Sequence, residues 1–189
     1  MTTAPGADGG VAGRTAIDRS KFRGLPPTVR DTKGRVRHAA LTDELTNLPN
    51  RLHFDVVYRL LWEAGGRGIA VTMVLFELPG LGSAPAEGQL RVGEKVNYIT
   101  RQMDMVARLD SDRVGALLVD CNAFGALIAA ERFQAELAPI LTELGVAFGA
   151  GIAAWKDWMT NPDDLLQAAE EATLFARSQG PNKIEIHSS

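Results

Sequence analysis

Ten consecutive residues, 69–78 (IAVTMVLFEL), constrain the fold more than any other part of the sequence, because they are apolar almost throughout. A strand that covers a core on one face alternates apolar and polar residues, whereas a continuous apolar run is typical of a strand buried on both faces. Pro79-Gly80 ends the run. The segment therefore predicts the middle of a sheet, with helices covering both sides.

The periodicity of the remaining sequence predicts four helices and four further strands. Apolar residues recur with helical spacing in some segments and form short runs in others. The predicted helices cover residues 51–65, 89–103, 123–144 and 162–179, and the predicted strands cover 105–109, 114–119, 146–154 and 183–187. In the first helix we expect a core-facing side made of Leu52, Val56, Val57, Leu60 and Leu61.

Strands 105–109 and 114–119 flank a tight polar turn, so they predict a β-hairpin. The hairpin lies between two strand–helix crossovers. This order predicts an α/β domain of the α+β type, with a central mixed five-stranded sheet and helices packed on it. It is the split βαβ, ferredoxin-like arrangement used by palm-type nucleotidyl cyclases and polymerases.

Charge divides the 189-residue chain into two parts. Residues 1–39 carry eight Lys and Arg against three Asp and Glu, whereas residues 40–189 carry 12 against 20. We interpret 1–39 as a disordered or weakly helical basic arm and 40–189 as the folded domain. An acidic domain argues against nucleic acid as its ligand. No apolar run approaches the roughly 20 residues of a membrane span, and the start lacks a secretory signal, so we expect a cytoplasmic protein without a membrane partner.

Three motifs, in order along the chain, resemble those of the GGDEF family. DELTNLPNR (43–51) is similar to the opening D-x-LTGLPNR, with Asn47 in place of glycine, and AAEEATLFARSQGPN (168–182) is similar to the closing AD-x-ALY-x-AK-x-x-GRN. The central RQMDMVARLDSDRV (101–114) keeps the spacing of R-x-x-D-x-x-x-R-Y-GGDEF. The resemblance covers about residues 40–186. It implies the fold of the diguanylate cyclases, which join two GTP molecules into cyclic di-GMP.

The signature that gives this family its name is replaced by Asp110-Ser111-Asp112-Arg113-Val114. The glycines let the backbone approach the nucleotide, and the acids hold the divalent metal that polarises the α-phosphate. Arg113 places a cation where the family has an acid. The resemblance leaves Glu77 and Asp112 as vestigial metal candidates, while Pro181 replaces an arginine that contacts phosphate. We therefore expect an inactive domain with no catalytic residues and no resident cofactor, and Mg²⁺ only if residual activity exists.

A second site of the family, which binds the cyclic di-GMP product, is matched in residue type and spacing. Arg101 and Asp104 form the R-x-x-D pair five residues before the signature, and Arg132 stands where a second arginine often completes the site. Arginine forks grip phosphate and the guanine Hoogsteen edge, and a carboxylate accepts from guanine N1 and N2. An alternative interpretation is an ordinary surface ion pair, i to i+3, at a helix end.

These residues lead to one hypothesis and two alternatives. The hypothesis is a catalytically inactive GGDEF protein that acts as a cyclic di-GMP receptor and relays binding to a protein partner or a second copy of itself. The first alternative is a ligand-independent protein-interaction module with the same fold. The second is a residual cyclase or GTP sensor, which Glu77, Asp112 and Arg177 would serve.

Overall fold

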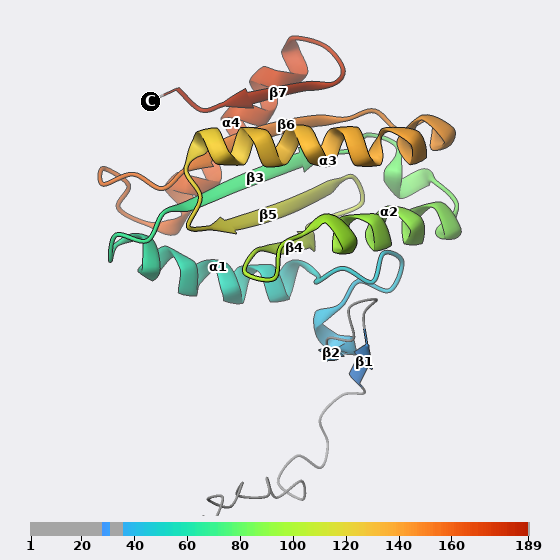
Figure 1. Ribbon diagram of the computed structural model, residues 1–189, viewed down its shortest axis with the longest axis horizontal. Helices are drawn as coiled ribbons and strands as arrows, with labels where there is room; N and C mark the ends of the chain where they lie inside the picture. Colours follow the sequence, from blue (N-terminus) through green and yellow to red (C-terminus); the bar gives the residue numbers. More distant parts are fainter. Residues whose placement is uncertain (1–27, 31–35, 189) are drawn as a thin grey trace, which may run out of the picture.

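The computed structural model describes residues 28–30 and 36–188 (Figure 1). The first 27 residues of the basic arm, and 31–35, lie outside the described residues. Within the arm, β1 (Thr28–Arg30) pairs antiparallel with β2 (Val36–His38), with Val29 opposite Arg37. The weakly helical lead-in expected around 29–39 is therefore replaced by two short strands, each with a β-branched residue next to arginine.

The domain is built on the predicted mixed sheet of five strands, and their order is β4-β5-β3-β6-β7. The central strand β3 runs antiparallel to both of its neighbours, and β6 and β7 are parallel to each other. β4 and β5 form the predicted hairpin. The strands are β3 (Val71–Glu77), β4 (Met105–Arg108), β5 (Arg113–Val119), β6 (Gly149–Ala154) and β7 (Lys183–Ile186).

Four helices cover the two faces of the sheet, and Figure 1 shows α3 lying across one of them. They are α1 (Arg51–Gly65), α2 (Ala86–Ile99), α3 (Ala123–Leu144) and α4 (Pro162–Ser178), with short 3₁₀ turns at η2 (Ala39–Leu41) and η3 (Leu81–Ser83). Val74 and Phe76 of β3 join the core under α2 and α3, whereas Met73 and Leu75 join the core under α1 and α4. The apolar run thus forms a strand buried on both faces.

Helix α2 ends four residues earlier than predicted. It stops at Ile99 because Thr100 has an extended backbone, with φ −72° and ψ 133°. Residues 101–104 form a separate turn, closed by a hydrogen bond from the Asp104 N–H to the Arg101 carbonyl at 3.2 Å. Arg101 and Asp104 therefore lie on a turn that leads into β4 and not on a helix end.

Helix α1 turns a different side to the core from the one predicted. Phe54 and Tyr58 are buried, whereas Leu52, Val56 and Leu60 are 58%, 53% and 67% exposed. Both sets of residues have helical spacing, so periodicity alone does not decide between them. The aromatic side buries more apolar surface and faces the sheet. Of the predicted residues, only Val57 and Leu61 pack against the core.

Candidate functional site

The turn of the β4–β5 hairpin contains the altered signature, and hydrogen bonds from the Arg108 side chain hold it in place. This guanidinium is buried, with the residue only 6% exposed. It donates to the carbonyls of Asp110 and Ser111 at 2.9 and 2.7 Å and to Oε1 of Gln89 at 2.7 Å. Oδ1 of Asp43 lies 3.4 Å away. The opening motif and α2 thus hold the turn through one side chain, whose role the sequence analysis missed.

Asp112 closes the loop that follows β3. Its Oδ1 accepts a hydrogen bond from the Gly82 N–H at 2.8 Å, and its carbonyl accepts one from the Leu78 N–H at 2.7 Å. The neighbouring Ser111 packs so tightly that a Cβ on Gly82 would lie 2.6 Å from its Cβ. The Gly82 N–H, which a loop of this kind can donate to a bound anion, is therefore already bonded to the Asp112 carboxylate.

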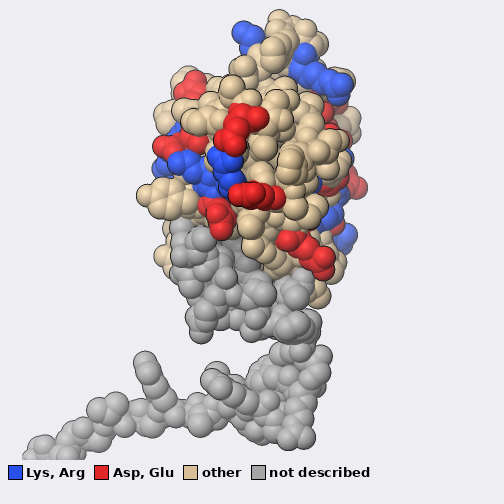
Figure 2. All heavy atoms as spheres, turned by 90° about the vertical axis from the view of Figure 1, so that its right-hand side faces the viewer, with Lys and Arg blue, Asp and Glu red and all other residues tan. Residues whose placement is uncertain are grey.

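The other acids of this end are paired with arginines. Arg113 bonds Asp110 at 2.5 Å and lies 3.4 Å from Glu170, and Arg177 lies 3.5 Å from Glu77. Burial alone would raise the pKa of Asp110, but the Arg113 side chain and two backbone N–H groups outweigh it and hold that pKa below its usual value. Figure 2 shows this end of the domain, where acidic and basic side chains lie next to one another.

These contacts do not fit the divalent metal that the family uses. Asp112 is bound to backbone, Glu77 faces the guanidinium of Arg177, and Arg113 adds a second positive charge that acts on Glu77. Among the described residues, no group of three or more His, Cys, Asp or Glu side chains is arranged to hold a metal ion. Val114, the last signature residue, is buried in the core.

The predicted product-site residues come together at the opposite end of the hairpin. The Asp104 Oδ1 accepts from the Val119 N–H at 3.2 Å, which ties the turn to the end of β5. Burial raises the pKa of Asp104, while the Val119 hydrogen bond and the charges of Arg101 and Arg132 act in the opposite direction. Both guanidinium groups thus lie close enough to act on one carboxylate.

The two arginines remain exposed beside Asp104. Arg132, on α3, donates to the Ile99 carbonyl at 3.3 Å. Across the part of the chain that the structure describes, no direct ion pair links Asp104 to either arginine, and the two charges act on it from a longer range. Tyr98 and Met103, at 74% and 69% exposure, lie within three residues of Arg101, and Ile128, at 65% exposure, lies one helical turn before Arg132 on α3. The proposed site therefore has two exposed cations, one held carboxylate and exposed apolar side chains nearby in the sequence.

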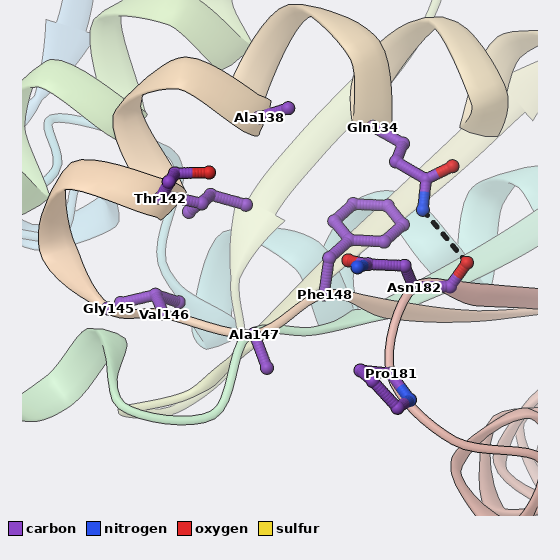
Figure 3. A pocket seen from close by; sticks show the side chains of 10 residues that line it. Gln134, Ala138, Thr142, Gly145, Val146, Ala147, Phe148, Pro181 and Asn182 are labelled. Atoms are coloured by element: carbon purple, nitrogen blue, oxygen red, sulfur yellow. Dashed lines mark hydrogen bonds between the residues drawn. The ribbon is translucent and has the colours of Figure 1, made fainter.

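A separate cavity of about 610 Å³ lies between the second half of α3 and the segments that precede β6 and β7 (Figure 3). Gln134 and Asn182 meet at its edge, where the Gln134 Nε2 donates to the Asn182 carbonyl at 3.0 Å. Pro181 lines it, and its lining residues carry no charge. A cavity without a cation does not suit a phosphate group.

Hydrogen bonds among its own polar residues hold the opening motif (43–51). The backbone conformation of this motif also explains why asparagine can replace the family's glycine at residue 47. The Asp43 Oδ1 accepts from both the N–H and the hydroxyl of Thr46, at 2.8 and 2.6 Å. Asn47, where the family has glycine, has φ +55°. Asparagine is among the few residues that tolerate this left-handed conformation.

The topology and the hairpin define a domain of the palm-type nucleotidyl cyclase class. A family model described as "Diguanylate cyclase, GGDEF domain" matches residues 40–183. The match covers well over half of the chain, which belongs to the GGDEF family. None of the curated proteins compared with it matches.

Solved GGDEF domains have the same fold. The GGDEF domain of DgcB from Caulobacter crescentus, solved in complex with c-di-GMP, aligns with a TM-score of 0.70 at 18% identity, covering 82% of this chain and 97% of that one. The GGDEF domain of YfiN (TpbB) from Pseudomonas aeruginosa gives 0.66 at 22%, covering 78% and 94%. Diguanylate cyclase SiaD from the same organism, solved with its activator SiaC, gives 0.70 at 18%, covering 78% and 62%.

Among the described residues, no helix is both long enough and apolar enough to cross a membrane.

Proposed function

We propose that this protein is a GGDEF domain without cyclase activity that binds cyclic di-GMP through Arg101, Asp104 and Arg132. The observation that carries the proposal is the placement of these three side chains. Arg101 lies on the turn before β4 and Arg132 lies in the middle of α3. The charge of each acts on the Asp104 carboxylate, which the Val119 N–H holds in position.

The chemistry of the cluster matches that of a guanine nucleotide with a phosphodiester. Each guanidinium can donate two parallel hydrogen bonds to phosphate oxygens or to guanine O6 and N7. The carboxylate of Asp104 can accept from guanine N1 and N2. A ligand that brings both groups would satisfy all three side chains, and the DgcB domain with which this chain aligns was solved with c-di-GMP.

The state of the signature turn supports the loss of catalysis. Attack by a ribose hydroxyl on GTP needs a metal between acidic oxygens and the triphosphate. Here the two vestigial candidates, Glu77 and Asp112, are taken by Arg177 and by the Gly82 N–H. We infer that this site offers GTP neither a bound divalent metal ion nor an unbonded backbone N–H, and that catalysis requires both.

A relay from ligand to protein partner is part of the same proposal. Diguanylate cyclase SiaD, with which this chain aligns, was solved in complex with its activator SiaC, so a protein that contains this fold can have a protein partner. In this chain, the exposed Tyr98, Met103 and Ile128 would lie next to bound cyclic di-GMP. A partner that contacts both the ligand and these side chains would sense whether the site is occupied.

Substitutions test the site. Arg101→Ala and Arg132→Ala should each weaken cyclic di-GMP binding by at least about tenfold, the effect of losing one charged pair. Arg91→Ala is the matched control, because it removes an arginine that lies on α2, outside the proposed site, and is bonded to Glu143. Equal affinity of all four proteins would contradict the assignment.

The absence of catalysis has its own test. Purified protein incubated with GTP and Mg²⁺ or Mn²⁺ should yield no cyclic product above a Glu77→Ala control. Product that depends on Glu77 would instead favour the residual cyclase.

A further inference from the structure

Helix α1 carries a second apolar stripe that the domain does not bury. Leu52, Val56 and Leu60 recur every four residues and are each more than half exposed, while Phe54 and Tyr58 fill the core on the other side. A helix that lies on the surface of a domain needs only one apolar side, and apolar residues on two sides are typical of a helix packed on both. Figure 1 shows α1 at the edge of the domain, below the sheet.

The charges beside this stripe point to one occupant. Arg51, Asp55, Arg59 and Glu63 also recur every four residues, so they form a ridge next to the apolar one. Read along the helix, the ridge has the signs plus, minus, plus, minus. In the opposite direction the order of signs is minus, plus, minus, plus. The ridge of one α1 is therefore complementary in charge to the ridge of an antiparallel second α1. In a parallel two-fold pair the two ridges would lie on opposite flanks and would not meet.

We propose that α1 is the interface of a two-fold symmetric dimer, in which the stripes of two copies pack antiparallel. The axis passes near Val56, which meets its own copy, while Leu52 packs against Leu60 of the other protomer. Because a two-fold axis brings the same flank of both helices together, Asp55 faces Arg59 and Arg51 faces Glu63 across the interface. Each of these ion pairs occurs twice.

The size of the stripe sets the strength of the dimer. The three aliphatic side chains expose roughly 300 Å² in total, which is within the range of a functional patch. Stable interfaces bury about 800 Å² per partner. The flanking charged side chains add to the area but leave the interface small. We therefore expect a dissociation constant in the micromolar range and an equilibrium that changes with protein concentration.

Sedimentation velocity of the full chain without nucleotide tests the proposal between about 5 and about 200 μM. The wild type should shift from monomer to dimer over this range. Val56→Glu places two like charges at the axis and should leave the protein monomeric. The side chain is 53% exposed in the monomer, so the substitution does not disturb the core. A wild type that stays monomeric at the highest concentration would overturn the proposal, as would a dimer that survives Val56→Glu.

Charge reversal tests the antiparallel arrangement. Asp55→Arg and Arg59→Asp each place like charges across the interface and should raise the dissociation constant about tenfold. The double variant with both changes again has a ridge complementary in charge to that of an antiparallel second α1 and should return to within about threefold of the wild type. A double variant as weak as the singles would show that another surface holds the dimer. Each variant is checked by circular dichroism for an unchanged fold.

Discussion

Arg108 offers the sharpest test of how the signature turn is held. We consider Arg108→Met, which keeps the side-chain stem and removes the guanidinium. The change takes away hydrogen bonds to the carbonyls of Asp110 and Ser111 and to Gln89, and it leaves Asp43 without its cation. Gln89 is only 3% exposed, so water does not replace the lost donor at its amide oxygen.

The contacts that Arg108→Met removes determine the expected loss in the free energy of unfolding. Hydrogen bonds from a charged donor are worth about 1.5–3 kcal/mol each, but the desolvation of the guanidinium offsets part of that sum. Breaking a buried charged network by removing one partner typically costs about 3–5 kcal/mol. We therefore expect the free energy of unfolding to fall by about 4 kcal/mol. With a urea m-value of about 2 kcal/mol/M, the midpoint moves down by about 2 M.

Urea unfolding followed by circular dichroism at pH 7 measures this shift. Arg91→Met is the control, because it removes an exposed arginine that is bonded only to the exposed Glu143, and its midpoint should match the wild type. If Arg108→Met unfolded within about 0.5 M of the wild type, the loss would be about 1 kcal/mol or less. That result would refute the role of the buried guanidinium.

Three further perturbations have defined outcomes. Asn47→Val should be about 1–3 kcal/mol less stable than Asn47→Gly in urea unfolding, because a β-branched residue is strained at φ +55° and glycine is not. Gly93→Ala should lose on the order of 3 kcal/mol in urea unfolding, since its Cβ would lie 1.9 Å from the Thr46 carbonyl oxygen, while Gly66→Ala meets no clash and should be tolerated. Burial raises the pKa of Asp104 in the fold, so the stability linked to its protonated form is present below the ordinary aspartate pKa and is lost as pH rises. Asp104→Asn should therefore be more stable than the wild type at pH 7 and equal to it near pH 3; a constant difference across that range would contradict the raised pKa.

The sheet and its hairpin could be predicted because local sequence determines them. The apolar run at the centre identifies β3 without knowledge of its partners, since such a run has few other places in a fold. The polar turn of Asp110 and Ser111 between two apolar runs likewise predicts a hairpin. These features depend on neighbours in sequence, and the structure confirms them.

Other features depend on residues far apart in the chain, and the sequence does not show them. The core-facing side of α1 was wrong for Leu52, Val56 and Leu60 because two stripes had the same period. The burial of Arg108 results from Asp43 and Gln89, which lie 65 and 19 residues away. The contact between Asp112 and Gly82 spans 30 residues. A charged residue in a strand ordinarily faces solvent, so the sequence alone offers no reason to expect the burial of Arg108.

The residues of the proposed site come from the sequence, but their local geometry could not be predicted from it. Arg101, Asp104 and Arg132 were selected from motif spacing, and the charges of both arginines lower the pKa of Asp104 against the effect of its burial. Thr100 ends α2 early, so the pair lies on a turn. The turn places Arg101 beyond the end of α2 and directs the chain into β4, whereas Arg132 lies on α3.

Isothermal titration of the purified, nucleotide-free chain with cyclic di-GMP tests the central claim most directly. We predict saturable binding in the micromolar range or tighter, with an affinity that falls at least about tenfold in Arg101→Ala and is unchanged in Arg91→Ala. No heat of binding at high micromolar ligand, or identical isotherms for the wild type and Arg101→Ala, would contradict the claim and favour a ligand-independent interaction module.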